Sequence, residues 1–232
     1  SPADCFDVAF EASRIALKYM MPVIVLTDGS LANGTEPWRI PDPETLPELP
    51  THEVAAGTDP EAFMPYGRDA DTLARPWALP GTPGLDHRVG GLEKAHLSGG
   101  VSYDPLNHEF MCRLRDERVR RVAQEIPKTA ILGDDTGDLL FVGWGSTEGV
   151  IRTTVQRLIG EGKKVSAVHL RHLNPLPPDL PDIMKRFGAV ICPEMNLGQL
   201  VKVLRAETLI DIKAVSKLQG QPFREDELHR KA

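Results

Sequence analysis

The chain has 232 residues, 41% of them hydrophobic, and a formal net charge of −6, so it can bury one large core or two small ones and has no overall basic character that would point to nucleic acid. Its three cysteines are far apart and show no CxxC spacing, which argues against an iron–sulfur or zinc site built within this chain. Sparse thiols suit a reducing cytoplasm better than a disulfide framework, and no apolar run approaches the roughly 20 residues that cross a bilayer.

The first residues predict a helix followed by a buried strand. Ser1 and Pro2 are typical of a helix start, small and aromatic residues then recur at helical spacing, and Pro22 ends the pattern. Residues 23–26 form a short apolar run rich in β-branched side chains, which is typical of a strand covered on both faces.

Residues 38–100 are rich in proline and keep no period for long, which predicts an ordered connector that wraps over a surface. Disorder of part of this stretch is the alternative. Aromatic and apolar residues that could anchor it are Trp38, Phe63, Tyr66, Trp77 and Leu79. After Asp104-Pro105, residues 105–126 combine many charges with an apolar side, which predicts a long and largely exposed helix that ends at Pro127.

The last stretch alternates short apolar runs with helical stripes, which predicts a small open α/β domain with a parallel sheet. Strands are expected at 139–142, 165–170, 189–192 and 210–214. Helices are expected between them, around Ile151–Leu158, Leu180–Phe187 and Leu197–Leu204.

Two loops of this domain are candidate contact sites. After the first strand, Gly143, Gly145, Ser146 and Thr147 lie in a GxGxxxG pattern, which misses the dinucleotide fingerprint by one residue. This loop is read as a tight turn, an anion site or a subunit contact. After the third strand, Asn196 and Gln199 would lie beyond the carboxyl end of the sheet, where ligands and partners gather, although helix capping by Asn196 would also explain it.

Two further patterns carry rival interpretations. Arg171, after the second strand, could meet a 2′-phosphate in an NADP-binding domain. His108 and Cys112 lie four residues apart on the predicted helix, a spacing that could hold a metal. Two ligands make a poor site and the sequence places no acid to complete it, so no metal site and no catalytic residue is assigned.

Six sequence blocks stand out: 22–29 (PVIVLTDG), 31–41 (LANGTEPWRIP), 102–108 (SYDPLNH), 173–177 (LNPLP), 194–200 (EMNLGQL) and 219–223 (QGQPF). They resemble the alpha subunit of 2-oxoacid:ferredoxin oxidoreductases, nearest to the 2-oxoglutarate type. Their order and spacing match over nearly the whole chain, and the blocks at 22–29, 31–41 and 194–200 are fairly specific.

This resemblance implies a domain order, a reaction and a set of cofactors. Residues 1–41 would be the C-terminal end of a pyrimidine-binding domain. The rest of the chain would be a Pro-rich connector (42–103), a charged helix (104–127), a transketolase C-terminal-like α/β domain (137–223) and a polar tail (224–232). The family decarboxylates a 2-oxoacid oxidatively with coenzyme A, which gives an acyl-CoA and reduced ferredoxin. Thiamine diphosphate with Mg and the iron–sulfur cluster would lie mostly on the beta subunit, in a dimer of alpha–beta units in the cytoplasm, so this chain alone would bind none of them.

One departure from the family matters. Its acidic residue that activates the aminopyrimidine would lie before Ser1, so the chain is expected to be a piece of a longer subunit and inactive alone. Asp28 and Asn33, on the loop after the first strand, are the local candidates for contacts to the cofactor or substrate. The competing functions are a non-catalytic scaffold module and the NADP-binding domain.

Overall fold

The computed structural model describes all 232 residues, and they divide into two compact units. One unit contains residues 1–2, 26–36 and 123–232, and the other contains residues 3–25 and 37–122. We call residues 123–232 the α/β domain and the second unit the connector unit. Each unit is described by itself.

The α/β domain is built on a five-stranded sheet with the order β1-β3-β2-β4-β5. Four strands are parallel neighbours, and the short β1 joins the edge of β3 in the antiparallel direction. The strands are β1 (Ile131–Leu132), β2 (Gly137–Trp144), β3 (Val165–Leu170), β4 (Phe187–Glu194) and β5 (Ile212–Ser216). The predicted open parallel sheet is therefore confirmed, with one antiparallel edge that the sequence did not indicate.

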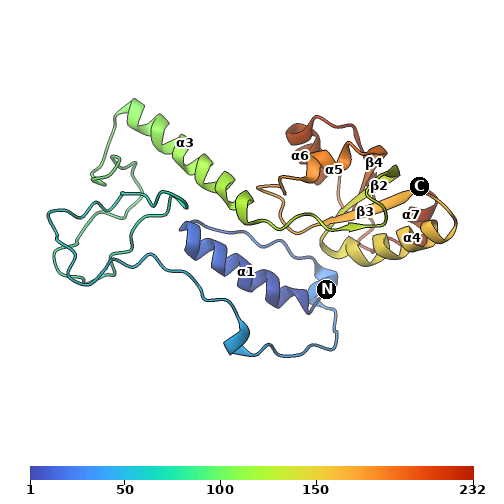
Figure 1. Ribbon diagram of the computed structural model, residues 1–232, viewed down its shortest axis with the longest axis horizontal. Helices are drawn as coiled ribbons and strands as arrows, with labels where there is room; N and C mark the ends of the chain where they lie inside the picture. Colours follow the sequence, from blue (N-terminus) through green and yellow to red (C-terminus); the bar gives the residue numbers. More distant parts are fainter. The chain divides into compact units, whose positions relative to one another are not determined.

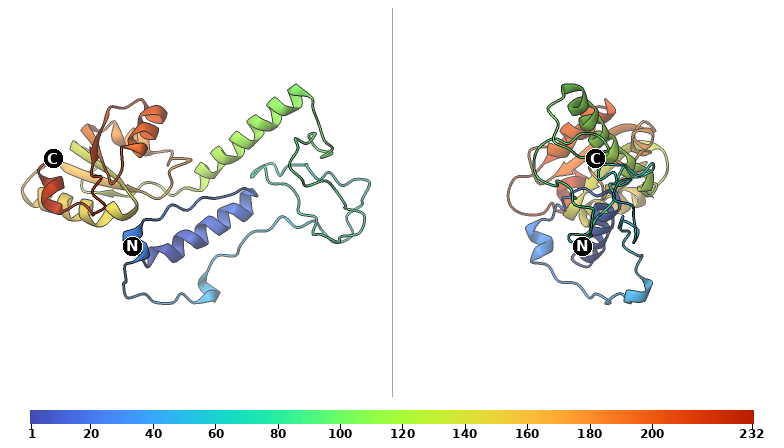
Figure 2. Two further views of the ribbon diagram at one scale, coloured as in Figure 1. Left: turned by 180° about the vertical axis from the view of Figure 1, so that it is seen from behind. Right: turned by 90° about the vertical axis from the view of Figure 1, so that its left-hand side faces the viewer.

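Helices cover both faces of this sheet, as Figures 1 and 2 show. Alternate residues of β2 point to opposite faces, so Leu139 and Phe141 join one apolar core and Leu140 and Val142 join the other. The first core contains residues of α4 (Glu148–Gly160) and α7 (Glu225–His229), and the second contains residues of α5 (Leu180–Met184) and α6 (Gln199–Thr208). This burial on both sides explains why the strands read as continuous apolar runs.

The end of the chain differs from expectation. Residues 224–232 were expected to be a polar tail, but they contain α7, whose Leu228 is fully buried against the core that also holds Phe223. Lys217 fastens this end by donating to the Pro222 carbonyl oxygen at 2.9 Å and to Glu227 Oε2 at 2.6 Å. A single apolar side chain among charged ones gives no periodic signal, so the sequence pattern could not show this helix.

The connector unit contains two helices and a long irregular segment. The predicted helices are confirmed as α1 (Asp4–Tyr19) and α3 (Pro105–Arg121), and Asp104 caps α3 by accepting from the Leu106 backbone N–H. The ends of the two helices meet in a small apolar cluster of Ile15, Tyr19 and Val122. Short 3₁₀ turns lie at Pro43–Thr45 and Val122–Glu125, the latter running into the other unit.

The segment between these helices is irregular, as predicted, and isolated bridges and side chains hold it. Three single bridges join Glu53 with Trp77, Tyr66 with Leu97, and Lys94 with Val101. Tyr66 is buried, as expected of an anchor, but Trp38 and Leu79 are exposed.

The predicted strand at 23–26 is wrong for this chain. The segment pairs with no other strand, and the side chains of Ile24 and Leu26 are exposed. A strand needs a neighbour to receive its backbone hydrogen bonds, and an apolar run cannot supply one. After it, α2 (Gly29–Ala32) forms a single helical turn. None of the helices combines the length and apolar character that a membrane span requires.

Candidate functional site

The first candidate site is the loop around Asp28, which the α2 turn shapes. Asp28 Oδ1 accepts from the Ser30 backbone N–H at 2.9 Å, from Ser30 Oγ at 2.6 Å and from the Leu31 backbone N–H at 3.1 Å. Asp28 is therefore the N-cap residue of α2, a role for which its short carboxylate is well suited.

Within the same unit, the side chain of Ser146 also hydrogen bonds to Asp28. Partial burial raises the pKa of Asp28, but the hydrogen bonds from Ser146, Ser30 and Leu31 outweigh it, so the pKa lies below its ordinary value. The structure thus brings together two residues that the sequence singled out separately, one for a cofactor contact and one for an anion or subunit contact. An ionised carboxylate at this place repels an anion rather than receiving one.

The residues of this loop do not by themselves fit thiamine diphosphate. The Asp28 carboxylate is committed to donors of its own chain, and the Asn33 side-chain amide donates to the Gly29 carbonyl oxygen at 2.8 Å. Asn33 is exposed. Both side chains shape a surface turn, so we derive no step of thiamine chemistry from them, and their contact with cofactor or substrate stays a prediction.

The glycine loop after β2 is a packing turn. A side chain at Gly143 would place its Cβ 2.5 Å from Ile151 Cδ1, so any other residue here would force the buried Ile151 side chain to move. Gly145 has a φ of 57°, a value that glycine adopts easily. Thr147 is buried and donates to the Trp144 carbonyl oxygen at 2.7 Å, which fixes the turn.

The loop after β4 uses its polar groups locally as well. Asn196 Oδ1 accepts from the backbone N–H groups of Gly198 and Gln199, at 2.8 and 3.2 Å. Since Gln199 is the first residue of α6, helix capping by Asn196 is confirmed, and the Glu194 carboxylate caps the next two backbone N–H groups, those of Leu200 and Val201, at 3.0 and 3.1 Å. Gln199 is exposed, so among these residues it is the side chain most open to a partner.

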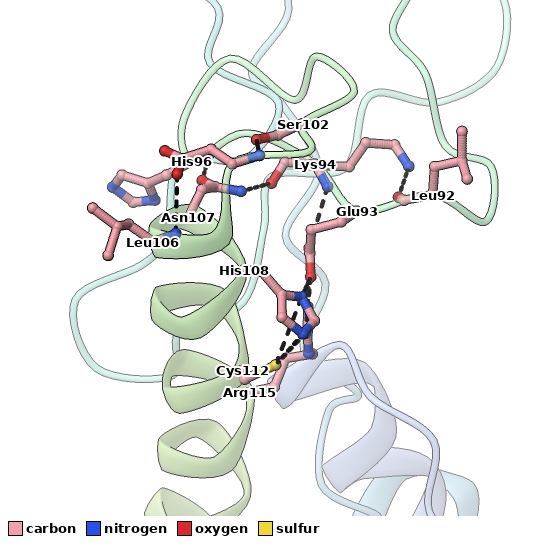
Figure 3. Close-up of polar contacts among 11 residues, drawn as sticks. Leu92, Glu93, Lys94, His96, Ser102, Leu106, Asn107, His108, Cys112 and Arg115 are labelled. Atoms are coloured by element: carbon pink, nitrogen blue, oxygen red, sulfur yellow. Dashed lines mark hydrogen bonds and ion pairs between the residues drawn. The ribbon is translucent and has the colours of Figure 1, made fainter.

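A second cluster, in the connector unit, was only half visible in the sequence. Figure 3 shows His108 and Cys112 on successive turns of α3, with Glu93 from the preceding loop and Arg115 beside them. His108 Nδ1 lies 2.9 Å from Glu93 Oε2, and Cys112 Sγ lies 3.6 Å from His108 Nε2. Arg115 donates to both Glu93 carboxylate oxygens, at 3.1 and 3.3 Å, and to Cys112 Sγ at 3.2 Å.

Glu93 is placed by the loop that carries it. Asn107, in the first turn of α3, donates to the Lys94 carbonyl oxygen at 2.8 Å and accepts from the His96 backbone N–H at 2.9 Å. The buried Lys94 ammonium is in turn satisfied by the carbonyl oxygens of Gly90 and Leu92. These bonds fasten the loop to the helix and hold Glu93 against His108, as Figure 3 shows.

Electrostatics of this cluster favour an ionised carboxylate. The hydrogen bonds from Arg115 lower the pKa of Glu93 to about 2 against a smaller effect of burial, and His108 and the Lys94 backbone N–H add to it. The same contact raises the pKa of Arg115. A carboxylate, an imidazole and a thiol arranged in this order are the groups that can activate a cysteine as a nucleophile.

The expectation that no acid completes the pair of His108 and Cys112 was wrong, because Glu93 does so from a loop without periodicity. One atom from each of the three lies within 4.8 Å of the others, close enough in principle for one metal ion. Arg115 holds two of these three groups, so a metal would have to displace a fixed cation. No sequence spacing predicted that Glu93 would contact His108, and in the sequence Arg115 was only one of many charged residues on the predicted helix.

Comparison with known proteins agrees with the sequence blocks. Residues 1–98 match the family described as pyruvate flavodoxin/ferredoxin oxidoreductase, thiamine diphosphate-binding. The 2-oxoglutarate oxidoreductase subunit KorA of Mycobacterium tuberculosis is 49% identical over 99% of this chain and 35% of its own length. Subunit alpha of 2-oxoacid:ferredoxin oxidoreductase 1 from Aeropyrum pernix is 30% identical over 94% of this chain and 35% of its own length.

A solved structure extends the likeness to three dimensions. The 2-oxoglutarate:ferredoxin oxidoreductase from Magnetococcus marinus, with 2-oxoglutarate, coenzyme A and succinyl-CoA bound, matches 98% of this chain and 40% of its own chain, with 34% identity and a TM-score of 0.88. The chain spans about 35% of the length of the two curated relatives named above. The resemblance carried by the sequence blocks is confirmed, and the chain is homologous to one part of the alpha subunits of 2-oxoacid:ferredoxin oxidoreductases.

Proposed function

We propose that this chain is part of the alpha subunit of an enzyme that oxidatively decarboxylates a 2-oxoacid, with 2-oxoglutarate the favoured substrate. The products are an acyl-CoA, carbon dioxide and reduced ferredoxin. The observation that carries this proposal is the 49% identity over 99% of the chain to a subunit named for 2-oxoglutarate oxidation. The likeness to a solved 2-oxoglutarate:ferredoxin oxidoreductase supports it.

The proposed role of this chain is to shape the catalytic centre and to pack against the partner subunit that completes it. Residues 1–41 would be the C-terminal end of the pyrimidine-binding domain, and residues 137–223 would be the transketolase C-terminal-like domain. Thiamine diphosphate with Mg, and the iron–sulfur cluster, would be held mostly by a beta subunit in a cytoplasmic dimer of alpha–beta units. The absence of a cysteine-rich motif here and the local engagement of Asp28 and Asn33 support this division.

Partner contacts are proposed at the loops 143–149 and 194–199. Of the residues selected there, Gly145 and Gln199 are exposed and Ser146 is half-buried, whereas Gly143 and Thr147 are buried and keep a packing role. Asn196 is occupied by its own turn. A subunit contact would therefore use Gly145, Ser146 and Gln199 first.

The test is activity of the assembled enzyme. We expect the full-length alpha subunit, purified with its beta subunit, to reduce ferredoxin only when 2-oxoglutarate and coenzyme A are both present. Pyruvate should give a much lower kcat/KM, because the favoured substrate carries a second carboxylate. Equal use of pyruvate would contradict the assignment of substrate, and turnover by the isolated 232-residue piece would contradict the division of labour.

A further inference from the structure

A group of arginines in the connector unit lacks acidic partners. Arg68, Arg75 and Arg118 make no ion pair with an acidic side chain, and all three are half-buried. The neighbouring Arg115 is different, because Glu93 neutralises it. Three guanidinium groups therefore share one region with no compensating charge from this chain.

The first two of these arginines are held on one aromatic ring. The Arg75 Cζ lies 4.6 Å and the Arg68 Cζ 5.7 Å from the centroid of the Tyr66 ring. Tyr66 is buried, and its backbone N–H donates to the Leu97 carbonyl oxygen at 3.0 Å. Each guanidinium also donates once to a backbone carbonyl at 3.3 Å, Arg68 to Leu73 and Arg75 to Pro65. The two side chains are thus fixed in place by cation–π contacts and hydrogen bonds.

Arg118 lies on α3, and its guanidinium group makes no hydrogen bond to the protein. Its Nε, like that of Arg68, is buried without a partner. Burial, together with the charges of Arg118 and Arg75, lowers the pKa of Arg68 to about 10, and burial with Arg75 and Arg115 lowers that of Arg118. The groups are therefore close enough to repel one another.

Such an arrangement is costly unless something offsets it. Removing a cation from water without a counter-charge is unfavourable, and buried donors without an acceptor are rare in folded proteins. Guanidinium groups match the oxygen atoms of phosphate closely and bind them with charge-assisted hydrogen bonds. A doubly charged oxyanion bound to the accessible parts of these half-buried guanidinium groups would accept charge-assisted hydrogen bonds and offset their mutual repulsion.

From this geometry we propose that Arg68, Arg75 and Arg118, on the Tyr66 ring, form a binding site for a phosphate-type dianion. The phosphate could be free or carried by a larger metabolite. The site does not depend on the reaction proposed above, since it rests on the local charge balance of the connector unit alone.

The experiment measures binding of inorganic phosphate to the assembled enzyme by calorimetry, without turnover, at constant ionic strength and at a slightly alkaline pH that keeps the phosphate a dianion. We expect saturable binding with one phosphate for each alpha subunit. Arg118→Gln should weaken it about tenfold or more, because a charged hydrogen-bond donor is lost, and Arg118→Lys should fall between the two. The matched control is Arg120→Gln, which removes an exposed charge of the same helix that is paired with Asp116 and should leave binding unchanged.

A fold control accompanies the binding. Since the Arg118 side chain makes no hydrogen bond to the protein, Arg118→Gln should keep or raise the thermal midpoint in phosphate-free buffer, while it reduces the increase that phosphate causes. Competition by coenzyme A would identify it as the carrier of the phosphate, and its failure to compete would identify a separate phosphate ligand. The proposal is overturned if the complex shows no saturable binding, or if Arg120→Gln weakens it as much as Arg118→Gln.

Discussion

The α/β domain and the connector unit are stabilised in different ways. In the α/β domain, buried apolar side chains from β2, β3, β4, β5 and four helices fill two cores on either side of a sheet. In the connector unit the apolar cluster is small, and the long irregular segment is held by side chains that bond to backbone carbonyls, such as Asn107, Lys94 and Arg121. The difference teaches that one unit depends mainly on the hydrophobic effect and the other on individual polar contacts.

The strongest test of this difference is removal of one aromatic ring from each unit. Phe141 on β2 is completely buried, so Phe141→Ala should cost about 3–5 kcal/mol through lost burial and a cavity. Phe110 on α3 is 45% exposed, so Phe110→Ala should cost less than about 1 kcal/mol. Hydrogen exchange of β2 and α3 peptides in the full-length subunit measures both costs. Equal destabilisation by the two substitutions would remove the distinction.

A smaller effect is expected from the buried carboxylate that caps α6. Glu194→Ala leaves two buried backbone N–H groups, of Leu200 and Val201, without an acceptor, which should cost about 2–4 kcal/mol. The control is Asn196→Ala in the adjacent turn, which is half-buried and should cost about 1 kcal/mol. Urea denaturation of the subunit and its variants compares them, and a larger cost at Asn196 would contradict the assignment of the cap.

The two units also differ in how far sequence could predict them. Residues 165–170 are a strand in both prediction and structure, because a buried parallel strand imposes a continuous apolar run on its own sequence. β1 has only two residues, and α7 contributes one buried leucine, so neither leaves a periodic pattern. The run at 23–26 shows the converse, since an apolar pattern alone forms no strand without a neighbour.

The candidate site was predictable only where local chemistry announces itself. The sequence alone singles out Gly143, Gly145 and Asp28. The hydrogen bond from Ser146, in the glycine loop, to Asp28 depends on the tertiary structure. Glu93 lies in an aperiodic segment, and its role arises from the loop that Asn107 fastens to α3. Polar networks between distant segments follow no regular spacing in the sequence. Contacts in the connector unit were therefore harder to predict from the sequence than the strands of the sheet.

The ion pair of Glu93 predicts a pH dependence confined to the connector unit. Its pKa is lowered from 4.5 to about 2, so the folded state favours the ionised form and Glu93 stabilises the unit fully above pH 4.5. This contribution is lost as the pH falls from 4.5 toward 2. We expect Glu93→Gln to remove it, at a cost of about 1 kcal/mol or less at neutral pH, because Arg115 is partly exposed.

The measurement is hydrogen exchange of α3 peptides between pH 5 and pH 2.5, roughly the window that the linkage relation gives, with the parent and Glu93→Gln corrected for intrinsic exchange. The difference between the two should shrink as the pH falls. Glu109→Gln is the control, because its pair with Arg113 is exposed on both sides and should change stability little. A difference that grows in acid would show that Glu93 is not stabilised as an anion.

The smallest expected effect concerns thiol reactivity, where the two units differ again. Cys192 on β4 is completely buried in the sheet, and burial raises the pKa of its thiol, so it should resist a maleimide until the α/β domain unfolds. Cys112 on α3 is exposed, and its Sγ accepts a hydrogen bond from Arg115, so it should react in the native subunit. Arg115→Gln should slow this labelling several-fold without changing that of Cys192, as mass spectrometry of tryptic peptides would show. Because the polar network holds Arg115 and the sulfur together, an unchanged rate in that variant would mean that exposure alone, and not the surrounding charges, sets the reactivity of Cys112.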